Sequence, residues 1–340
     1  MNPVDKWLAA AAFMIAVLGT GAMRRYALRK NMLDVPNDRS SHALPTPRGG
    51  GVAIVAAFFI AILGVAFVTR PGVAVVSALL AGGGAIAGIG YLDDRRTLSA
   101  SLRLSVHLAV AILVIAAIGG IPDRSMVHWG VHGAWVGSSI AVLALVCATN
   151  VFNFMDGIDG LAAGEAVFVG LAGAGLTWYV SGDSGAAGAL LCLAAASFGF
   201  LLWNVSPARI FMGDAGSGFL GFTIAVLSLI AIRRDGMPVE VFAILGGLFI
   251  SDATVTLLRR MLRGDRWLDA HRSHAYQRLA RRWNGHLPVT MLAIAINLVW
   301  LLPWAVLAAR VPDYARWFLA AALLPLILLA LALGAGARES

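Results

Sequence analysis

Residues 134–161 read A-W-V-G-S-S-I-A-V-L-A-L-V-C-A-T-N-V-F-N-F-M-D-G-I-D-G-L. The apolar run over 134–152 is about as long as a helix that crosses the hydrocarbon layer of a membrane. Two carboxylates follow it, Asp156 and Asp159, and each precedes a glycine. Because another apolar run begins directly afterwards, we predict that these acids stand at the boundary between two membrane-spanning segments.

The same pattern recurs along all 340 residues, of which 59% are hydrophobic and 13% are charged. A soluble domain is about 45–50% apolar and about 25% charged. The runs are continuous and do not alternate as barrel strands would, and a helix satisfies its own backbone polar groups in lipid. We therefore predict an all-α polytopic membrane bundle that forms one domain over residues 1–340.

Eleven spans are predicted from the lengths of the apolar runs. They cover residues 6–23, 50–69, 73–92, 102–120, 134–152, 160–180, 186–203, 216–232, 239–258, 288–309 and 316–335. The first run follows the non-basic segment Met1–Asp5 and precedes Arg24 and Arg25, so we expect a retained helix and not a cleaved signal.

Lys and Arg residues are unevenly divided between the two predicted sides, with 19 of the 26 on one side and 7 on the other. Loops rich in Lys and Arg stay in the cytoplasm. We predict a multi-pass membrane protein with its N-terminus outside and its C-terminus in the cytoplasm. The cytoplasmic loops are about 24–49, 93–102, 150–160, 204–216 and 259–287. The net charge of +8 then reflects topology, and no nucleic-acid partner is expected.

Five aspartates fall at predicted cytoplasmic ends of spans: Asp93, Asp94, Asp156, Asp159 and Asp214. Carboxylates that converge at a membrane boundary need a compensating cation. Mg²⁺ prefers oxygen ligands, takes few of them from protein and binds substrate phosphates as well. We therefore predict a Mg²⁺ site, with Mn²⁺ as the alternative ion. For any single acid, capping of a helix amino end is an equally good interpretation.

Two polar loops carry donors for phosphate groups. Residues 34–51 place Arg39, His42 and Arg48 among prolines and glycines, and residues 271–278 read H-R-S-H-A-Y-Q-R. Such donors favour diphosphate or nucleotide binding, and a basic surface that only sets topology is the alternative. Zinc is disfavoured because further zinc ligands are not apparent nearby. Acids, a metal and a basic rim at one membrane face suggest phosphoryl chemistry between a lipid phosphate and a water-soluble diphosphate.

Five motifs in this order resemble those of the polyprenyl-phosphate N-acetylhexosamine-1-phosphate transferases, the superfamily of MraY and WecA (glycosyltransferase family 4). They are P-T-P-R-G-G (45–50), D-D-R (93–95), N-V-F-N-F-M-D-G-I-D-G-L (150–161), P-A-R-I-F-M-G-D-A-G-S (207–217) and H-R-S-H (271–274). The chain looks closest to the WbpL-like branch that initiates O-antigen. The cell-wall translocase has three histidines in a row where this chain has H-R-S-H.

The resemblance implies transfer of N-acetylhexosamine-1-phosphate from a UDP-N-acetylhexosamine to undecaprenyl phosphate, with release of UMP, to initiate a cell-surface polysaccharide such as O-antigen. It matches Asp214 to the metal, the Asp93–Asp94 pair to the lipid phosphate and base catalysis, and the His271–His274 loop to the sugar or its diphosphate. The predicted site residues are Asp93, Asp94, Asp156 and Asp159 as catalytic, Arg48, Asn150, Asn153, His271, Arg272 and His274 as substrate-binding, and Asp214 and Asp156 as metal ligands.

Two alternatives stay open at this stage. A secondary transporter would use polar residues inside spans, and His107, Glu165 and Asp252 are candidates. Transfer of a muramoyl-pentapeptide phosphate is the other alternative. The identity of the sugar, the choice between single and double displacement, the base and a homodimeric state are also left open.

Overall fold

The computed structural model describes residues 2–36, 44–70, 72–122, 125–126, 129–183, 185–265 and 271–338. Two predicted phosphate donors, Arg39 and His42, lie outside these residues. Across the described ranges, ten helices are long and apolar enough to cross a membrane, or eleven when one bent pair counts as a single span. The prediction of an all-α polytopic membrane bundle is confirmed.

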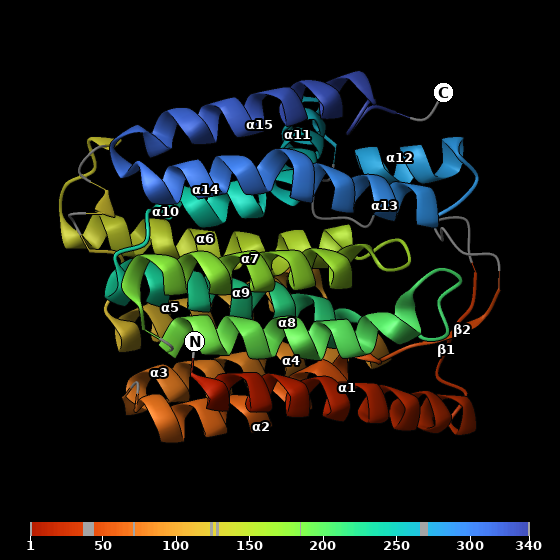
Figure 1. The fold of residues 1–340 in the computed structure, drawn as a ribbon. Helices are drawn as coiled ribbons and strands as arrows, with labels where there is room; N and C mark the ends of the chain where they lie inside the picture. Colours follow the sequence, from red (N-terminus) through yellow and green to blue (C-terminus); the bar gives the residue numbers. More distant parts are fainter. Residues whose placement is uncertain are drawn as a thin grey trace.

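The long helices lie side by side with similar axes (Figure 1). The elements in chain order are α1 (Pro3–Arg29), β1 (Leu33–Asp34), β2 (Thr46–Pro47), α2 (Gly51–Thr69), α3 (Val73–Ser77), η1 (Ala78–Gly82), α4 (Gly83–Arg96), α5 (Ala100–Ile118), α6 (Ala134–Met155), α7 (Leu161–Ser181), α8 (Gly185–Asn204), α9 (Asp214–Asp235), α10 (Val239–Leu245), α11 (Gly247–Leu262), α12 (Ala275–Arg282), α13 (Leu287–Ile296), η4 (Asn297–Leu301), α14 (Leu302–Arg310), η5 (Pro312–Tyr314) and α15 (Ala315–Ala332). Each predicted span coincides with one of these helices or with a run of consecutive ones.

The predicted span 239–258 is not one straight helix. The structure divides it into α10 and α11, whose axes differ by 77°. The break falls at Gly246 and Gly247, where two successive glycines weaken a helix by about 1 kcal/mol each. A side chain at Gly247 would also meet Leu323 of α15. Helix α11 packs against α15 and also contacts α12, which directly follows the H-R-S-H loop.

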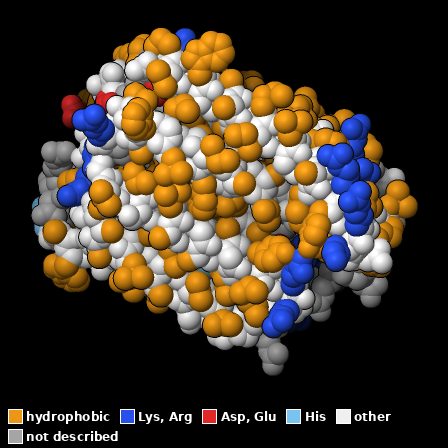
Figure 2. Space-filling model, turned by 90° about the horizontal axis from the view of Figure 1, so that it is seen from below, with side chains coloured by type: hydrophobic (Ala, Val, Ile, Leu, Met, Phe, Trp, Pro, Cys, Tyr) orange, Lys and Arg blue, Asp and Glu red, His pale blue; other side chains and the backbone are white. Residues whose placement is uncertain are grey.

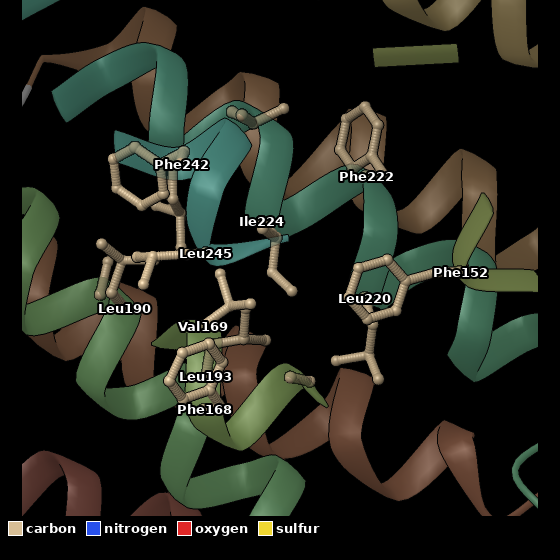
Figure 3. Close-up of a cluster of buried hydrophobic side chains, with 14 of the residues drawn as sticks. Phe152, Phe168, Val169, Leu190, Leu193, Leu220, Phe222, Ile224, Phe242 and Leu245 are labelled. Carbon is tan, nitrogen blue, oxygen red and sulfur yellow. The ribbon is translucent and has the colours of Figure 1, made fainter. Parts of the chain in front are cut away.

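Helix α9 forms the centre of the bundle. It contacts α2, α4, α6, α7 and α8, and nearly all of its side chains are buried. Phe152 of α6 lies beside Leu220 of α9, and Phe168 of α7 and Leu193 of α8 belong to the same buried cluster as Ile224 of α9 (Figure 3). The residues at the ends of α9 are therefore held in place by the helices around it.

Hydrophobic side chains cover the outer face formed by α1 and α2, and Lys and Arg side chains gather at the ends of the helices (Figure 2). Trp7 and Leu18 of α1 and Ile60, Leu63 and Phe67 of α2 are among the exposed apolar residues. A soluble protein rarely exposes such a continuous apolar surface. Lipid contact accounts for it.

Candidate functional site

Two of the predicted motifs are hydrogen-bonded to each other at one end of the bundle. Strand β2 pairs antiparallel with β1, and Arg48 forms a parallel bridge with Phe211. The amides of Gly49 and Gly50 both donate to the Phe211 carbonyl, at 3.1 and 2.9 Å, and the Phe211 amide donates to the Pro47 carbonyl at 2.8 Å. The segment P-T-P-R-G-G thereby lies beside I-F-M-G-D. We call this end of the bundle, at the right of Figure 1, the polar end.

The pairing of the two motifs brings five charged side chains together. Arg48 Nη2 lies 2.6 Å from Asp94 Oδ1 and 2.9 Å from Asp214 Oδ1. Arg103 Nη1 lies 2.5 Å from Asp93 Oδ2 and 3.3 Å from Asp214 Oδ2. Asp214 is therefore held between two arginines from distant parts of the chain. We call Arg48, Asp93, Asp94, Arg103 and Asp214 the aspartate–arginine cluster.

The two aspartates of D-D-R have different surroundings. Asp94 accepts hydrogen bonds from the amides of Asp214 and Ala215, at 3.0 and 3.3 Å, so it caps the amino end of α9 from α4. Asp93 accepts from the amide of Leu98 at 2.6 Å. The Asp94 side chain is 4% exposed, whereas that of Asp214 is 20% exposed. Asp214 is therefore more accessible than Asp94 to a metal or a phosphate.

Gly90 allows α4 to approach the first turn of α9. A Cβ atom at this position would lie 2.4 Å from the Asp214 carbonyl oxygen and 2.6 Å from the Ala215 nitrogen. Both are backbone atoms, so neither can rotate away, and overpacking of this kind costs about 1–3 kcal/mol. We expect Gly90→Ala to lower the thermal unfolding midpoint in detergent by several degrees. Gly88→Ala on the same helix, where a Cβ meets nothing within 4 Å, is the matched control and should unfold like the wild type.

Asp156 directly follows the last residue of α6 and lies within the electrostatic reach of the cluster. Burial raises the pKa of its carboxyl group well above the ordinary value, the negative charges of Asp214 and Asp94 raise it further, and Arg48 partly opposes them. A site that raises the pKa of a carboxyl group in this way favours a bound cation or a proton. Asp156 thus completes a set of four neighbouring carboxylates.

Asp159 is directed elsewhere. Its carboxylate accepts from the Ala208 amide at 3.1 Å and lies 3.2 Å from His286 Nδ1. Burial alone would raise the pKa of Asp159, but these hydrogen bonds outweigh burial and lower it. The Asp159 carbonyl accepts from the Thr290 hydroxyl at 2.8 Å. Asp159 thus links the turn after α6 to the segment before α9 and to α13, while its predicted catalytic role remains a prediction.

The two asparagines of the motif also separate. The Asn153 amide donates to the Ser217 hydroxyl in the first turn of α9, at 3.3 Å, so it lies beside the cluster. The Asn150 amide donates to the Val146 carbonyl at 2.7 Å and lies 3.3 Å from His107 Nδ1 on α5. Both amide hydrogens of Asn150 are engaged within the bundle, so its contact with substrate stays a prediction.

The H-R-S-H loop lies against the end of α6. The rings of His271 and His274 are stacked with centroids 5.0 Å apart, and each centroid lies 6.3 Å from that of Phe154. Burial lowers the pKa of His271 to about 4, with help from His274 and Arg260, so this imidazole is neutral at neutral pH. Arg272 shares the loop, and its carbonyl accepts from Arg281 at 3.1 Å.

Three residues that sequence reasoning did not assign to the site are placed in or beside it by the structure. Arg103 joins the cluster, His286 pairs with Asp159, and Asp252 bonds to the H-R-S-H loop. The sequence signal for Arg103 was weak, because a basic residue near a span end is already explained by topology. Only the packing of α5 against α4 and α6 reveals the role of its charge.

The donor set suits Mg²⁺ better than a softer metal. Among the residues that the structure describes, no group of three or more His, Cys, Asp and Glu side chains is spaced to hold a metal ion. Mg²⁺ typically takes one or two carboxylates and completes its shell with water and substrate phosphates. Asp214 and Asp156 supply two such carboxylates in one negative field, so they fit this ion.

Comparison with known proteins agrees with these motifs. The family model for glycosyl transferase family 4 matches residues 76–232. A probable undecaprenyl-phosphate N-acetylglucosaminyl 1-phosphate transferase of Bacillus subtilis (strain 168) is 30% identical over 297 residues, which are 85% of this chain and 82% of the relative. A decaprenyl-phosphate N-acetylglucosaminephosphotransferase of Mycobacterium tuberculosis (strain ATCC 25618 / H37Rv) is 31% identical over 83% of this chain and 77% of its own length. A phospho-N-acetylmuramoyl-pentapeptide-transferase of Moorella thermoacetica is 32% identical over 49% of this chain and 51% of its own.

Proposed function

This chain belongs to glycosyl transferase family 4, and from that membership we propose the donor, the acceptor and the place of the reaction. The chain is a multi-pass membrane phosphotransferase that transfers a hexosamine phosphate to a polyprenyl phosphate. The donor is a UDP-N-acetylhexosamine and the acceptor is undecaprenyl phosphate. The products are undecaprenyl-diphospho-N-acetylhexosamine and UMP. The reaction takes place at the cytoplasmic face of the bacterial inner membrane and initiates a surface polysaccharide such as O-antigen.

The observation that carries this proposal is the aspartate–arginine cluster at the polar end. Four contacts of 2.5 to 3.3 Å between arginine nitrogens and aspartate oxygens connect its two arginines and three aspartates. These residues come from the first loop, from α4, from α5 and from the start of α9. The cluster lies at the ends of the helices, and a lipid phosphate group would reach it at the surface of the bilayer. A soluble diphosphate reaches the same point from the aqueous side.

The reaction requires one bond to form and one to break. An oxygen of the lipid phosphate attacks the β-phosphorus of the UDP-sugar, and the bond between that phosphorus and the oxygen that bridges to the α-phosphate breaks, so that UMP leaves. The acceptor phosphate has a second pKa near 6 and is largely ionised at neutral pH. Asp93, fixed by Arg103 and by the Leu98 amide, orients it or accepts its remaining proton.

Phosphoryl transfer depends mainly on positioning and on neutralising charge. Arg48 and Arg103 lie where they can exchange part of their contact with the aspartates for the phosphate oxygens of the two substrates. Asp214 and Asp156 would hold Mg²⁺, which would supply charge neutralisation on the donor diphosphate. We assign Asn153 and the H-R-S-H loop to the nucleotide and the sugar of the donor.

The sugar is the least constrained part of the proposal. The relatives named for N-acetylglucosamine 1-phosphate align over more than four fifths of the chain, and the muramoyl-pentapeptide relative aligns over 49% of it. This coverage favours an unsubstituted N-acetylhexosamine. H-R-S-H in place of three consecutive histidines points the same way. The names of the relatives, which are phosphotransferases, favour the enzyme over the secondary-transporter alternative.

A membrane assay tests the proposed function. Membranes that contain the protein are incubated with undecaprenyl phosphate, Mg²⁺ and a series of radiolabelled UDP-N-acetylhexosamines, with and without EDTA. We expect label in the lipid phase together with UMP, and the active donor identifies the sugar. Release of UDP would mean that sugar moves without its phosphate, and an unchanged donor pool with every sugar would refute the proposal.

The pH dependence of this reaction should respond to Mg²⁺. Because the pKa of Asp156 is raised by burial and by Asp214, this group takes up a proton well above the ordinary carboxyl pKa of about 4. A cation binds the ionised form, so a higher Mg²⁺ concentration lowers the apparent pKa. We expect the acidic limb of the rate–pH profile to move to lower pH as Mg²⁺ rises. A limb that stays in place would separate Asp156 from the metal.

A further inference from the structure

Asp252 is a buried acid on α11, and no step of the proposed reaction uses it. Its side chain is almost fully enclosed, with the residue 5% exposed. A buried carboxylate is costly unless its oxygens are hydrogen-bonded. Four donors surround this one: His274 Nδ1 at 3.2 Å, the Thr256 hydroxyl at 3.0 Å, and the backbone amides of Ala275 and Tyr276, both at 3.0 Å.

These contacts indicate which ring nitrogen of His274 carries the hydrogen. Because Asp252 Oδ1 accepts, Nδ1 of His274 carries a hydrogen. The other ring nitrogen, Nε2, is buried and has no hydrogen-bond partner among the described residues, and the whole residue is 1% exposed. A buried polar nitrogen without a partner needs an explanation, and a ligand that binds there is one. The neighbouring His271 has its Nε2 in the same condition.

Asp252 also controls the turn that carries Asp156. Its second oxygen holds the Tyr276 amide, and the Tyr276 hydroxyl donates to the Phe154 carbonyl at 2.9 Å. A Cβ at Gly157 would lie 2.2 Å from that hydroxyl, so the turn packs closely on the tyrosine. One carboxylate therefore connects the broken span, the H-R-S-H loop and the motif at the end of α6.

We propose that Asp252 is a positioning residue of the donor site: it keeps the proton on His274 Nδ1 and directs Nε2 to a phosphate oxygen of the sugar-nucleotide diphosphate. This inference rests on the proposed function. A hydrogen bond from Nε2 to a phosphate oxygen needs a hydrogen on that nitrogen as well as on Nδ1, and Asp252 would balance the positive charge of that ring. The titratable groups that face this ring are Asp252 on α11, His271 in the loop and Tyr276 on α12, while Arg260 acts on His271.

A double-mutant cycle tests whether Asp252 acts through His274. Asp252→Asn and His274→Ala should each raise the KM for the UDP-sugar by about 10- to 100-fold, the range of one charge-assisted hydrogen bond. The double variant should be no worse in donor KM than His274→Ala, because the two changes interrupt one interaction. The KM for undecaprenyl phosphate should stay within about twofold in all three. Multiplicative effects on donor KM would overturn the proposal.

Thr256→Val is the matched control on the same face of α11. It removes one of the four donors to Asp252 and leaves the contacts with His274, Ala275 and Tyr276 in place. We expect its donor KM to stay near the wild-type value. A rise as large as that of Asp252→Asn would show that any disturbance of this helix weakens donor use, and the specific role of Asp252 would be lost.

A second measurement does not depend on turnover or on the folding of Asp252→Asn. In wild-type protein labelled with ¹⁵N only in its histidine rings, His274 should have its hydrogen on Nδ1, and His274→Ala identifies the signal. Addition of the UDP-sugar should shift its Nε2 resonance toward the protonated form. A ring with hydrogen only on Nε2 overturns the proposal. If the wild-type protein transferred no label from any donor, the proposed function would fail, and the tautomer would still decide the role of Asp252.

Discussion

Asp214→Asn should reduce transfer by at least about 1,000-fold, because we assign the proposed metal to this carboxylate and the charge that a metal supplies to a transition state is worth several kcal/mol. The same change should remove the response to added Mg²⁺. Asp214 is the carboxylate between Arg48 and Arg103, and it is more exposed than Asp94. An asparagine keeps the size of the side chain and the start of α9, so the loss would come from charge.

The stability of this variant separates the metal role from a structural one. Asp214, Asp94 and Asp156 repel one another, so removal of one charge should leave the thermal midpoint unchanged or slightly higher in EDTA. Asp235→Asn, at the opposite end of the same helix, is the control and should keep wild-type turnover. Near-wild-type transfer by Asp214→Asn would refute the metal assignment. An unfolded variant would instead make Asp214 a structural cap.

Most of the fold is predictable from sequence because the length of an apolar run is a local property. The first span and the span at 50–69 agree with α1 and α2, and even 160–180, which contains Glu165, is a complete helix. The break at Gly246 was not predicted. Glycine is frequent in transmembrane helices, and the close packing of Gly247 against Leu323 of α15 at the bend is seen only in the structure.

The site, like the fold, is only partly predictable from the sequence. The acids of D-D-R and F-M-G-D could be brought together from sequence, because all lie at span ends on one predicted side. The partners of each acid could not, because they depend on side-chain direction within a loop. Asp159 is three residues after Asp156 and shares its motif, yet it bonds to Ala208 and His286 and not to the cluster. In the sequence Asp252 is an isolated acid inside a predicted span, and only the structure shows that His274, 22 residues later, lies beside it.

Arg103→Gln should lower turnover by about 100-fold, the cost of removing one preorganised charge from a phosphoryl site. Arg103 contacts Asp93 and Asp214 with the same nitrogen. Its loss removes one of the two arginine charges of the cluster and one contact of Asp93, which keeps the hydrogen bond from the Leu98 amide. Arg96→Gln, an exposed arginine at the end of α4 in the same basic stretch, is the matched control and should keep wild-type turnover.

The affinity of Arg103→Gln for the metal should increase although its turnover decreases. Because the arginine neutralises the carboxylates that attract a cation, its removal makes the field at Asp214 more negative. We expect the Mg²⁺ concentration for half-maximal rate to fall even though the maximal rate falls too, and direct Mn²⁺ binding measured by electron paramagnetic resonance should tighten. Arg103→Lys keeps the charge on a point donor and should restore the metal requirement more fully than the rate, because a lysine lacks the planar fork that binds phosphate. A weaker affinity for Mn²⁺ in Arg103→Gln would show that Arg103 supports the metal site and does not compete with it.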